Sequence, residues 1–120
     1  MAKNIIKVNR GDSYEFTVRV PDKENNSKSY ILTGTDAIYF ALCYPHQRFE
    51  DAIFIKGYDH TDYINTEEIL IKIEPKDTVN LAPGVYYYTI KLLQGGTFGT
   101  IGDAEEVRTI IERTKFIINE

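Results

Sequence analysis

The stretch from residue 83 to residue 93 reads PGVYYYTIKLL and decides the fold class. Pro83-Gly84 predicts a turn, after which core-forming and more polar side chains alternate. Alternation with a period of two is typical of a β-strand that buries one face. The residues predicted to face the core are Tyr86, Tyr88, Ile90 and Leu92. Tyr87 and Thr89 are then expected to point away from the core.

The same alternation recurs on both sides of this stretch. Residues 13–20 place apolar side chains at every second position, and residues 69–73 alternate isoleucine with other residues. Residues 37–44 read AIYFALCY without a charge, which predicts a central strand that is covered on both faces. Residues 52–55 predict its hairpin partner, and residues 5–8 predict a short opening strand.

Two segments need a different interpretation. Pro75-Lys76-Asp77-Thr78 predicts one short helical turn near residues 75–80, with proline at the first helical position. The segment 103–113 leaves two alternatives open. Asp103 followed by Glu106 fits a helical capping box, whereas the many β-branched residues favour a strand with a bulge near Arg113. We favour the strand.

These elements predict an all-β fold. About seven or eight strands joined by turn residues indicate an antiparallel β-sandwich. A small open barrel is compatible with the same pattern. A length of 120 residues suits one β-sandwich domain over residues 1–120.

Charge and cysteine content argue against several classes of protein. The net charge is −4, with 14 basic and 18 acidic residues, so a nucleic-acid or anionic-membrane binder is not expected. No apolar run approaches the ~20 residues that span a bilayer. Cys43 is the sole cysteine and cannot form an internal disulfide, which fits folding in a reducing cytosol.

Polar motifs offer little catalytic chemistry. The glycine-rich residues 95–102 lack the spacing and the lysine of a phosphate-binding loop, and predict a flexible hairpin. Asp59, His60 and Asp62 are metal-ligand types, yet they are too few for a zinc or calcium site. Together with Tyr58 they form a candidate ligand-binding loop. Because no nucleophile, base and orienting group can be named together, we expect no enzyme, no metal and no cofactor.

Aromatic residues suggest an interface instead. The chain has nine tyrosines and no tryptophan. Exposed aromatic side chains anchor many protein–protein interfaces. We therefore predict Tyr87 with its neighbour Thr89, and Phe98 at the tip of the glycine-rich hairpin, as candidate interface residues.

Four short motifs occur in a characteristic order. They are RGDSYEFTV at residues 10–18, YILTGTDA at residues 30–37, IKIEPKDT at residues 71–78 and LAPGVYYYTI at residues 81–90. In this order, over roughly residues 5–118, the chain resembles the small immunoglobulin-like β-sandwich domains of tailed-bacteriophage structural proteins. These include the N-terminal domain of upper baseplate proteins.

The resemblance implies an immunoglobulin-like sandwich and a non-enzymatic assembly module of a phage or prophage tail or baseplate. Such a module acts through protein–protein interfaces with other virion proteins or with copies of itself. It is located in the virion, or in the cytoplasm of the bacterial host before assembly. The alternative function is a soluble β-sandwich that binds a carbohydrate or small ligand through the loop containing Tyr58 and Asp59.

Overall fold

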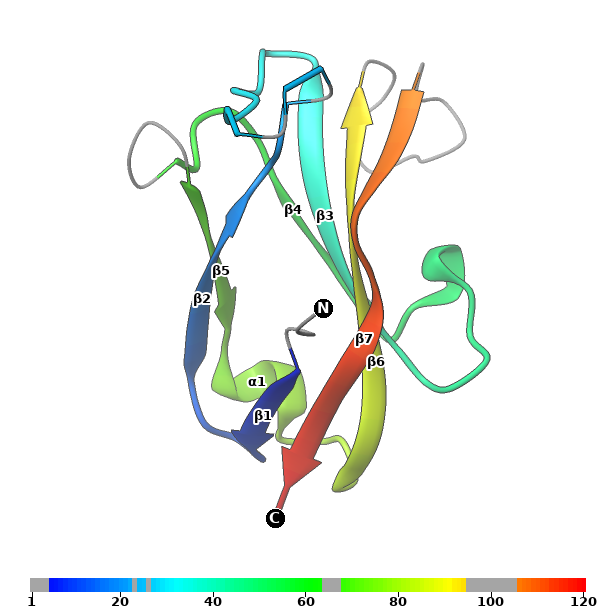
Figure 1. Ribbon diagram of the computed structural model, residues 1–120. Coiled ribbons are helices and arrows are strands. Elements are labelled where there is room, and N and C mark those ends of the chain that lie inside the picture. The colour runs from blue at the N-terminus through cyan, green and yellow to red at the C-terminus, as the bar shows by residue number, and fades with distance from the viewer. Residues whose placement is uncertain (1–4, 23, 26, 64–67, 95–105) are drawn as a thin grey trace.

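The computed structural model describes residues 5–22, 24–25, 27–63, 68–94 and 106–120, which form mostly β-structure in two facing sheets (Figure 1). The larger sheet contains, in spatial order, β1 (Ile6–Asn9), β7 (Glu106–Asn119), β6 (Gly84–Gln94), β3 (Asp36–Cys43) and β4 (Phe54–Tyr58). The smaller sheet pairs β2 (Tyr14–Arg19) with β5 (Glu68–Ile73). The helical turns are η1 (Phe49–Asp51) and α1 (Pro75–Thr78). The predicted all-β class and the predicted turn near residues 75–80 are confirmed.

The larger sheet is mixed and not purely antiparallel. β1 runs parallel to β7, with Ile6 opposite Phe116, whereas the other three pairings are antiparallel. A parallel pair needs a connection of a dozen or more residues, and here nearly the whole chain lies between the two strands. The expectation of an antiparallel arrangement is therefore wrong for this pair, because alternation along a strand does not report its direction.

The apolar core fills the space between the two sheets. Phe16 on β2 reaches across, with ring centroids 6.1 Å from Phe40 on β3 and 6.3 Å from Tyr88 on β6. Phe40 and Tyr88 stack at 5.4 Å. The four residues of β6 that were predicted to face the core are all buried: Tyr86, Tyr88, Ile90 and Leu92. The predicted alternation is thus confirmed for this strand.

Strand β3 is buried on both faces, as predicted. Every residue from Asp36 to Cys43 is buried. Its even-numbered apolar residues face the core between the sheets, while Ala37 and Tyr39 pack with Phe49 on the outer face. The predicted hairpin of β3 with β4 is also confirmed, although β4 begins and ends later than residues 52–55.

Strand β7 shows which of the two alternatives for residues 103–113 is correct over its described part, residues 106–113. Residues 106–119 form a strand, so the helical alternative is wrong there, while Asp103 lies outside the described residues. Ile111 lies opposite Ile90, and Thr114 lies opposite Tyr88. β7 therefore carries an extra residue near Arg113, which confirms the predicted bulge.

Hydrogen bonds fix a turn at each end of the molecule. In the first turn, the N–H of Asp12 donates to the carbonyl of Asn9 at 3.0 Å, and Gly11 takes a φ of +83° that suits glycine. At the other end, the buried carboxylate of Asp36 accepts the N–H of Thr33 at 3.0 Å and the hydroxyl of Tyr30. These bonds hold the chain ahead of β3.

Candidate functional site

Tyr87 and Thr89 lie on the outer face of the larger sheet, as predicted, and both are half-buried. The guanidinium carbon of Arg113 lies 4.8 Å from the centroid of the Tyr87 ring, in a cation–π contact. Arg113 also donates to the carbonyls of Tyr44 and Gln47, at 3.1 Å each. The Tyr87 ring, which was predicted to contact a partner protein, thus already contacts Arg113 of its own chain.

Arg113 is a residue that the sequence did not single out. The one signal was the expected bulge in its segment, because a bulge turns side chains away from the regular alternation. The third predicted interface residue, Phe98, lies outside the described residues. The structure therefore places two of the three candidate interface residues side by side and does not address the other.

The candidate ligand loop is partly a strand. Tyr58 is the last residue of β4 and not a loop residue, because the β3 hairpin continues with Tyr58 opposite Ile38. Its hydroxyl accepts the N–H of Lys72 at 3.3 Å, and burial raises the pKa of Tyr58. The side chain of Tyr58 thus connects β4 to β5.

The four polar residues after Tyr58, at positions 59–62, form a turn. A carboxylate oxygen of Asp59 accepts the N–H of Thr61 at 2.9 Å and its hydroxyl at 2.6 Å, and these bonds lower the pKa of Asp59. The N–H of Asp59 donates to the carboxylate of Asp62 at 2.7 Å. His60 is exposed. Among the residues that the structure describes, no group of three or more potential metal ligands occurs.

An open hollow of about 360 Å³ brings two of these residues together with β5. It is lined by Lys56, Tyr58, Asp62, Leu70, Lys72 and Glu74. Burial lowers the pKa of Lys56, but the carboxylate of Asp77, 2.6 Å from its ammonium, outweighs burial and leaves the pKa raised. The hollow includes Tyr58 and Asp62 of the predicted loop and leaves Asp59 and His60 outside.

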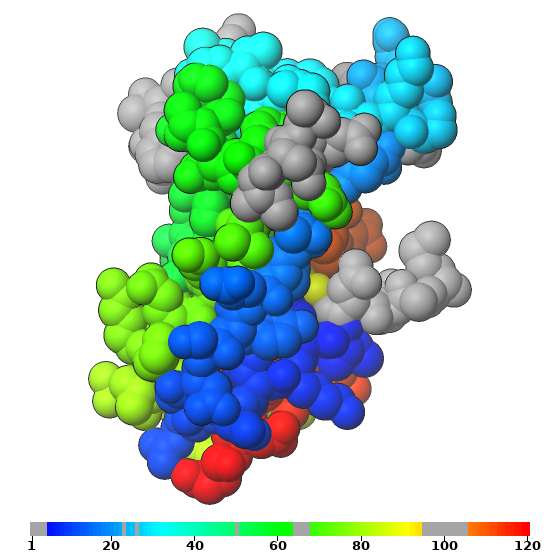
Figure 2. Space-filling model, turned by 90° about the vertical axis from the view of Figure 1, so that its left-hand side faces the viewer, coloured from blue at the N-terminus to red at the C-terminus, as the bar shows by residue number. Residues whose placement is uncertain are grey.

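A second opening lies on the opposite side of the molecule, between β2 and β7. β1 pairs only with residues 116–119 of β7, so residues 106–115 have no partner strand on that edge within the described chain. In Figure 2 the orange atoms of β7 are visible beyond the blue atoms of β2. We call this opening the seam.

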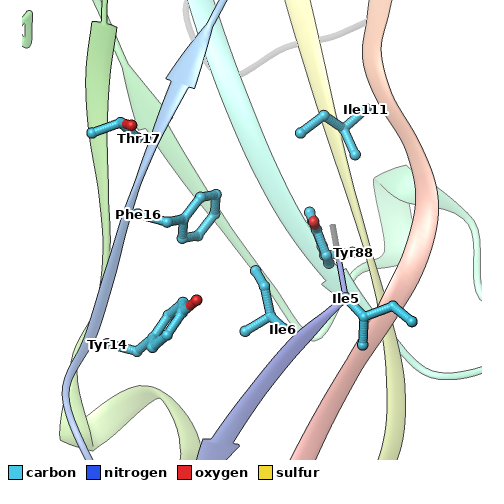
Figure 3. A pocket seen from close by; sticks show the side chains of 7 residues that line it. All are labelled: Ile5, Ile6, Tyr14, Phe16, Thr17, Tyr88 and Ile111. Atoms are coloured by element: carbon cyan, nitrogen blue, oxygen red, sulfur yellow. The ribbon is translucent and has the colours of Figure 1, made fainter. Parts of the chain in front are cut away.

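A cavity of about 240 Å³ lies in the seam (Figure 3). Its walls come from β2 on one side and, on the other, from β6, β7 and β1 with the residue that precedes it: Tyr14, Phe16 and Thr17, and Tyr88, Ile111, Ile6 and Ile5. Burial, with a smaller contribution from Tyr14, raises the pKa of Tyr88 to about 12. The seam is thus a cavity lined mainly by isoleucine and aromatic side chains, beside an open strand edge.

The seam was not anticipated from the sequence. The only available signal was the contrast in length between the opening strand and the last strand. Four residues of β1 cannot cover a strand of 14 residues. That contrast becomes informative only when the two strands are known to pair.

Comparison with known proteins finds no similar protein: no family model, no curated protein and no solved structure matches the chain. Within the described residues, no helix has the length and apolar character needed to cross a bilayer. Function must therefore be argued from the site itself.

Proposed function

We propose that the two sheets form an immunoglobulin-like β-sandwich. In such domains the second and fifth strands pair in one sheet while the third, sixth and seventh strands share the other. The strands β2 and β5, and β3, β6 and β7, follow that division. The hydroxyl of Tyr86 donates to the carbonyl of Ala82 at 2.5 Å, which matches the tyrosine corner of these domains.

We infer that this domain is a non-enzymatic assembly module of a phage or prophage virion, acting through protein–protein contacts. The seam is the observation that carries this inference. A strand from a partner would complete the open edge of β7 and place alternate apolar side chains in the cavity. Few small ligands could satisfy both the main chain and the apolar wall. The motif order described above supports the virion as the setting.

Binding to purified tail and baseplate proteins tests this function. We expect the full chain to form a complex with one of them at micromolar concentration. Ile5, which is 48% exposed and lines the cavity, allows a seam variant that spares the core. Ile5→Asp should weaken the complex about tenfold, since a charge at an apolar contact costs on the order of 1–3 kcal/mol. Ile55→Asp, at a 43% exposed position on β4, is the matched control.

The outcomes distinguish the assembly function itself from the seam as its interface. Failure to bind any virion protein would contradict the assembly function. A complex that is equally sensitive to both substitutions, or to neither, would leave the function standing and contradict the seam as its interface.

A second candidate function is the binding of a carbohydrate or small ligand. The hollow beside Tyr58 favours it, because aromatic, acidic and basic side chains meet there in a space of about 360 Å³. A glycan array should return a reproducible hit that Asp62→Ala abolishes and Asp51→Ala retains. An array without a reproducible hit would contradict this alternative for glycans.

A further inference from the structure

The connection between β3 and β4 folds back over the outer face of the larger sheet. Residues 44–52, which we call the strap, lie on the side of this sheet away from β2 and β5 (Figure 1). Within the strap, Phe49 packs against Ala37, Tyr39 and Leu93. The thiol of Cys43 donates to the carbonyl of Arg48 at 3.7 Å. The strap therefore covers side chains that would otherwise face solvent.

The covered face is apolar. Its residues on β3 and β6 are at most 5% exposed: Ala37, Tyr39, Ala41, Cys43 and Leu93. The smaller sheet cannot account for this burial, because it packs on the opposite face, where it contacts Phe40 and Tyr88. The strap supplies a second layer over the centre of the larger sheet.

The strap itself is held mostly by polar contacts at its surface. Arg113 donates hydrogen bonds to the carbonyls of Tyr44 and Gln47, and the ammonium of Lys91 lies 5.0 Å from the centroid of the Phe49 ring. Phe49 is its apolar anchor on the face, and it is only half-buried. His46 adopts a left-handed φ of 69°, which is uncommon for a residue other than glycine. Few buried apolar contacts are typical of segments that open locally.

We propose that the strap opens as a unit while both sheets stay folded, and that Arg113 is the latch that keeps it closed. Opening breaks the two hydrogen bonds from Arg113 and lifts Phe49 off Ala37 and Tyr39. The apolar face of β3 and the thiol of Cys43 then become accessible. This device does not depend on the proposed virion function, since it concerns access to one face of the sheet.

Cys43 provides a direct readout, because it is the only cysteine of the chain and lies beneath the strap. The probe is Ellman's reagent, added to the full-length protein at pH 8. The labelling rate is compared with that of the urea-unfolded chain. A series at low urea concentrations then separates two routes to the thiol. Local opening exposes little surface and gives a nearly flat urea dependence, whereas global unfolding gives a steep one.

Three variants complete the experiment. Arg113→Ala should raise the native-state labelling rate by about tenfold or more, because two hydrogen bonds from a charged donor are lost. Phe49→Ala should raise it as well, since it removes the apolar anchor. Lys115→Ala is the matched control, because Lys115 is an exposed residue of β7, the strand that carries Arg113, and lies opposite Tyr87 on β6. The thiol of this variant should be labelled at the same rate as that of the original protein.

The flat urea dependence must persist in Arg113→Ala for the proposal to stand. If labelling follows the slope of global unfolding in both proteins, the strap does not open on its own. If Arg113→Ala labels no faster than Lys115→Ala, then Arg113 is not the latch. A general loss of stability cannot imitate the expected result, because it would steepen the urea dependence of labelling.

Discussion

The hydroxyl of Tyr86 ties the turn before β6 to the core. The ring is buried, and the hydroxyl donates to the carbonyl of Ala82 at 2.5 Å. Tyr86→Phe keeps the ring and removes this donor, so we expect the free energy of unfolding to fall by about 1 kcal/mol. Urea denaturation followed by circular dichroism measures the loss. Tyr44→Phe, on an exposed ring 5.5 Å from Tyr86, is the control, and an equal effect of both substitutions would contradict the role of the hydrogen bond.

Tyr88 links stability to alkaline pH. Burial raises its pKa from 10.0 to about 12, so the folded protein keeps the phenol protonated where the unfolded chain loses the proton. The stabilisation is complete below pH 10 and is lost as the pH rises toward 12. We expect Tyr88 to contribute a loss of about 1.4 kcal/mol per pH unit in this interval. Urea titrations at several pH values should show a shallower decline for Tyr88→Phe, and equal declines would contradict the assignment.

Single residues were predictable where the strand period alone decides them. The outward direction of Tyr87 and the inward direction of Tyr86 and Tyr88 follow from alternation, and both are confirmed. The contact of Tyr87 with Arg113 could not be predicted, because it depends on a bulge and on the register of two strands. Whether Tyr87 and Thr89 contact a partner stays a prediction.

At the scale of elements, the ion pair between Asp77 and Lys56 holds α1 against β4. The carboxylate of Asp77 accepts the N–H of Glu74 at 2.7 Å and lies 2.6 Å from the ammonium of Lys56. The side chains of Asp77 and Lys56 are only 11% and 18% exposed. Asp77→Ala leaves the ammonium of a mostly buried Lys56 side chain with weaker compensation and removes the acceptor of the Glu74 N–H, so unfolding should cost about 2 kcal/mol less.

The exposed ion pair of η1 provides the matched control for this prediction. Arg48 and Asp51 lie 2.9 Å apart with side chains that are 76% and 53% exposed. Asp51→Ala should change the free energy of unfolding by no more than about 0.5 kcal/mol. Thermal and urea unfolding of both variants provide the comparison. Similar effects would show that burial does not set the strength of the Asp77 pair.

Elements were predictable to the extent that their side chains alternate or lack charge. The uncharged residues 37–43 correctly indicated a strand covered on both faces, whereas Tyr44, the last residue of the predicted strand, lies beyond β3 and is 49% exposed. What covers the outer face was not predictable, because residues 45–51 are mostly polar and such segments usually remain in solvent. The strap becomes visible only when Phe49 is seen against Ala37 and Tyr39.

At the scale of the whole molecule, the two sheets should unfold together. A sheet of two strands is marginally stable by itself, so β2 and β5 depend on their contacts with the larger sheet. Phe16 provides such contacts with Phe40 and Tyr88. Native-state hydrogen exchange should give the slowest amides of β5 the same opening free energy as those of β3. A much lower value for β5 would identify the smaller sheet as a separate unit.

The seam illustrates why the overall arrangement was harder to predict than its parts. Its wall residues Phe16 and Tyr88 were each expected to face a core. Whether these residues border an opening depends on which strands pair and over what length, and a single sequence does not reveal the pairing. The hollow beside Tyr58 has the same origin, since it requires β4 and β5 to approach from separate sheets.

The pairing of β1 with β7 also determines the order in which the larger sheet can be completed. Ile6 lies opposite Phe116, at nearly opposite ends of the sequence, so local folding cannot place β1. During synthesis β1 leaves the ribosome before the other strands of the described fold, and it remains unpaired until β7 has also been synthesised. Chaperones that recognise short apolar extended segments would therefore meet this N-terminal strand sooner, and for longer, than any other strand of the described fold.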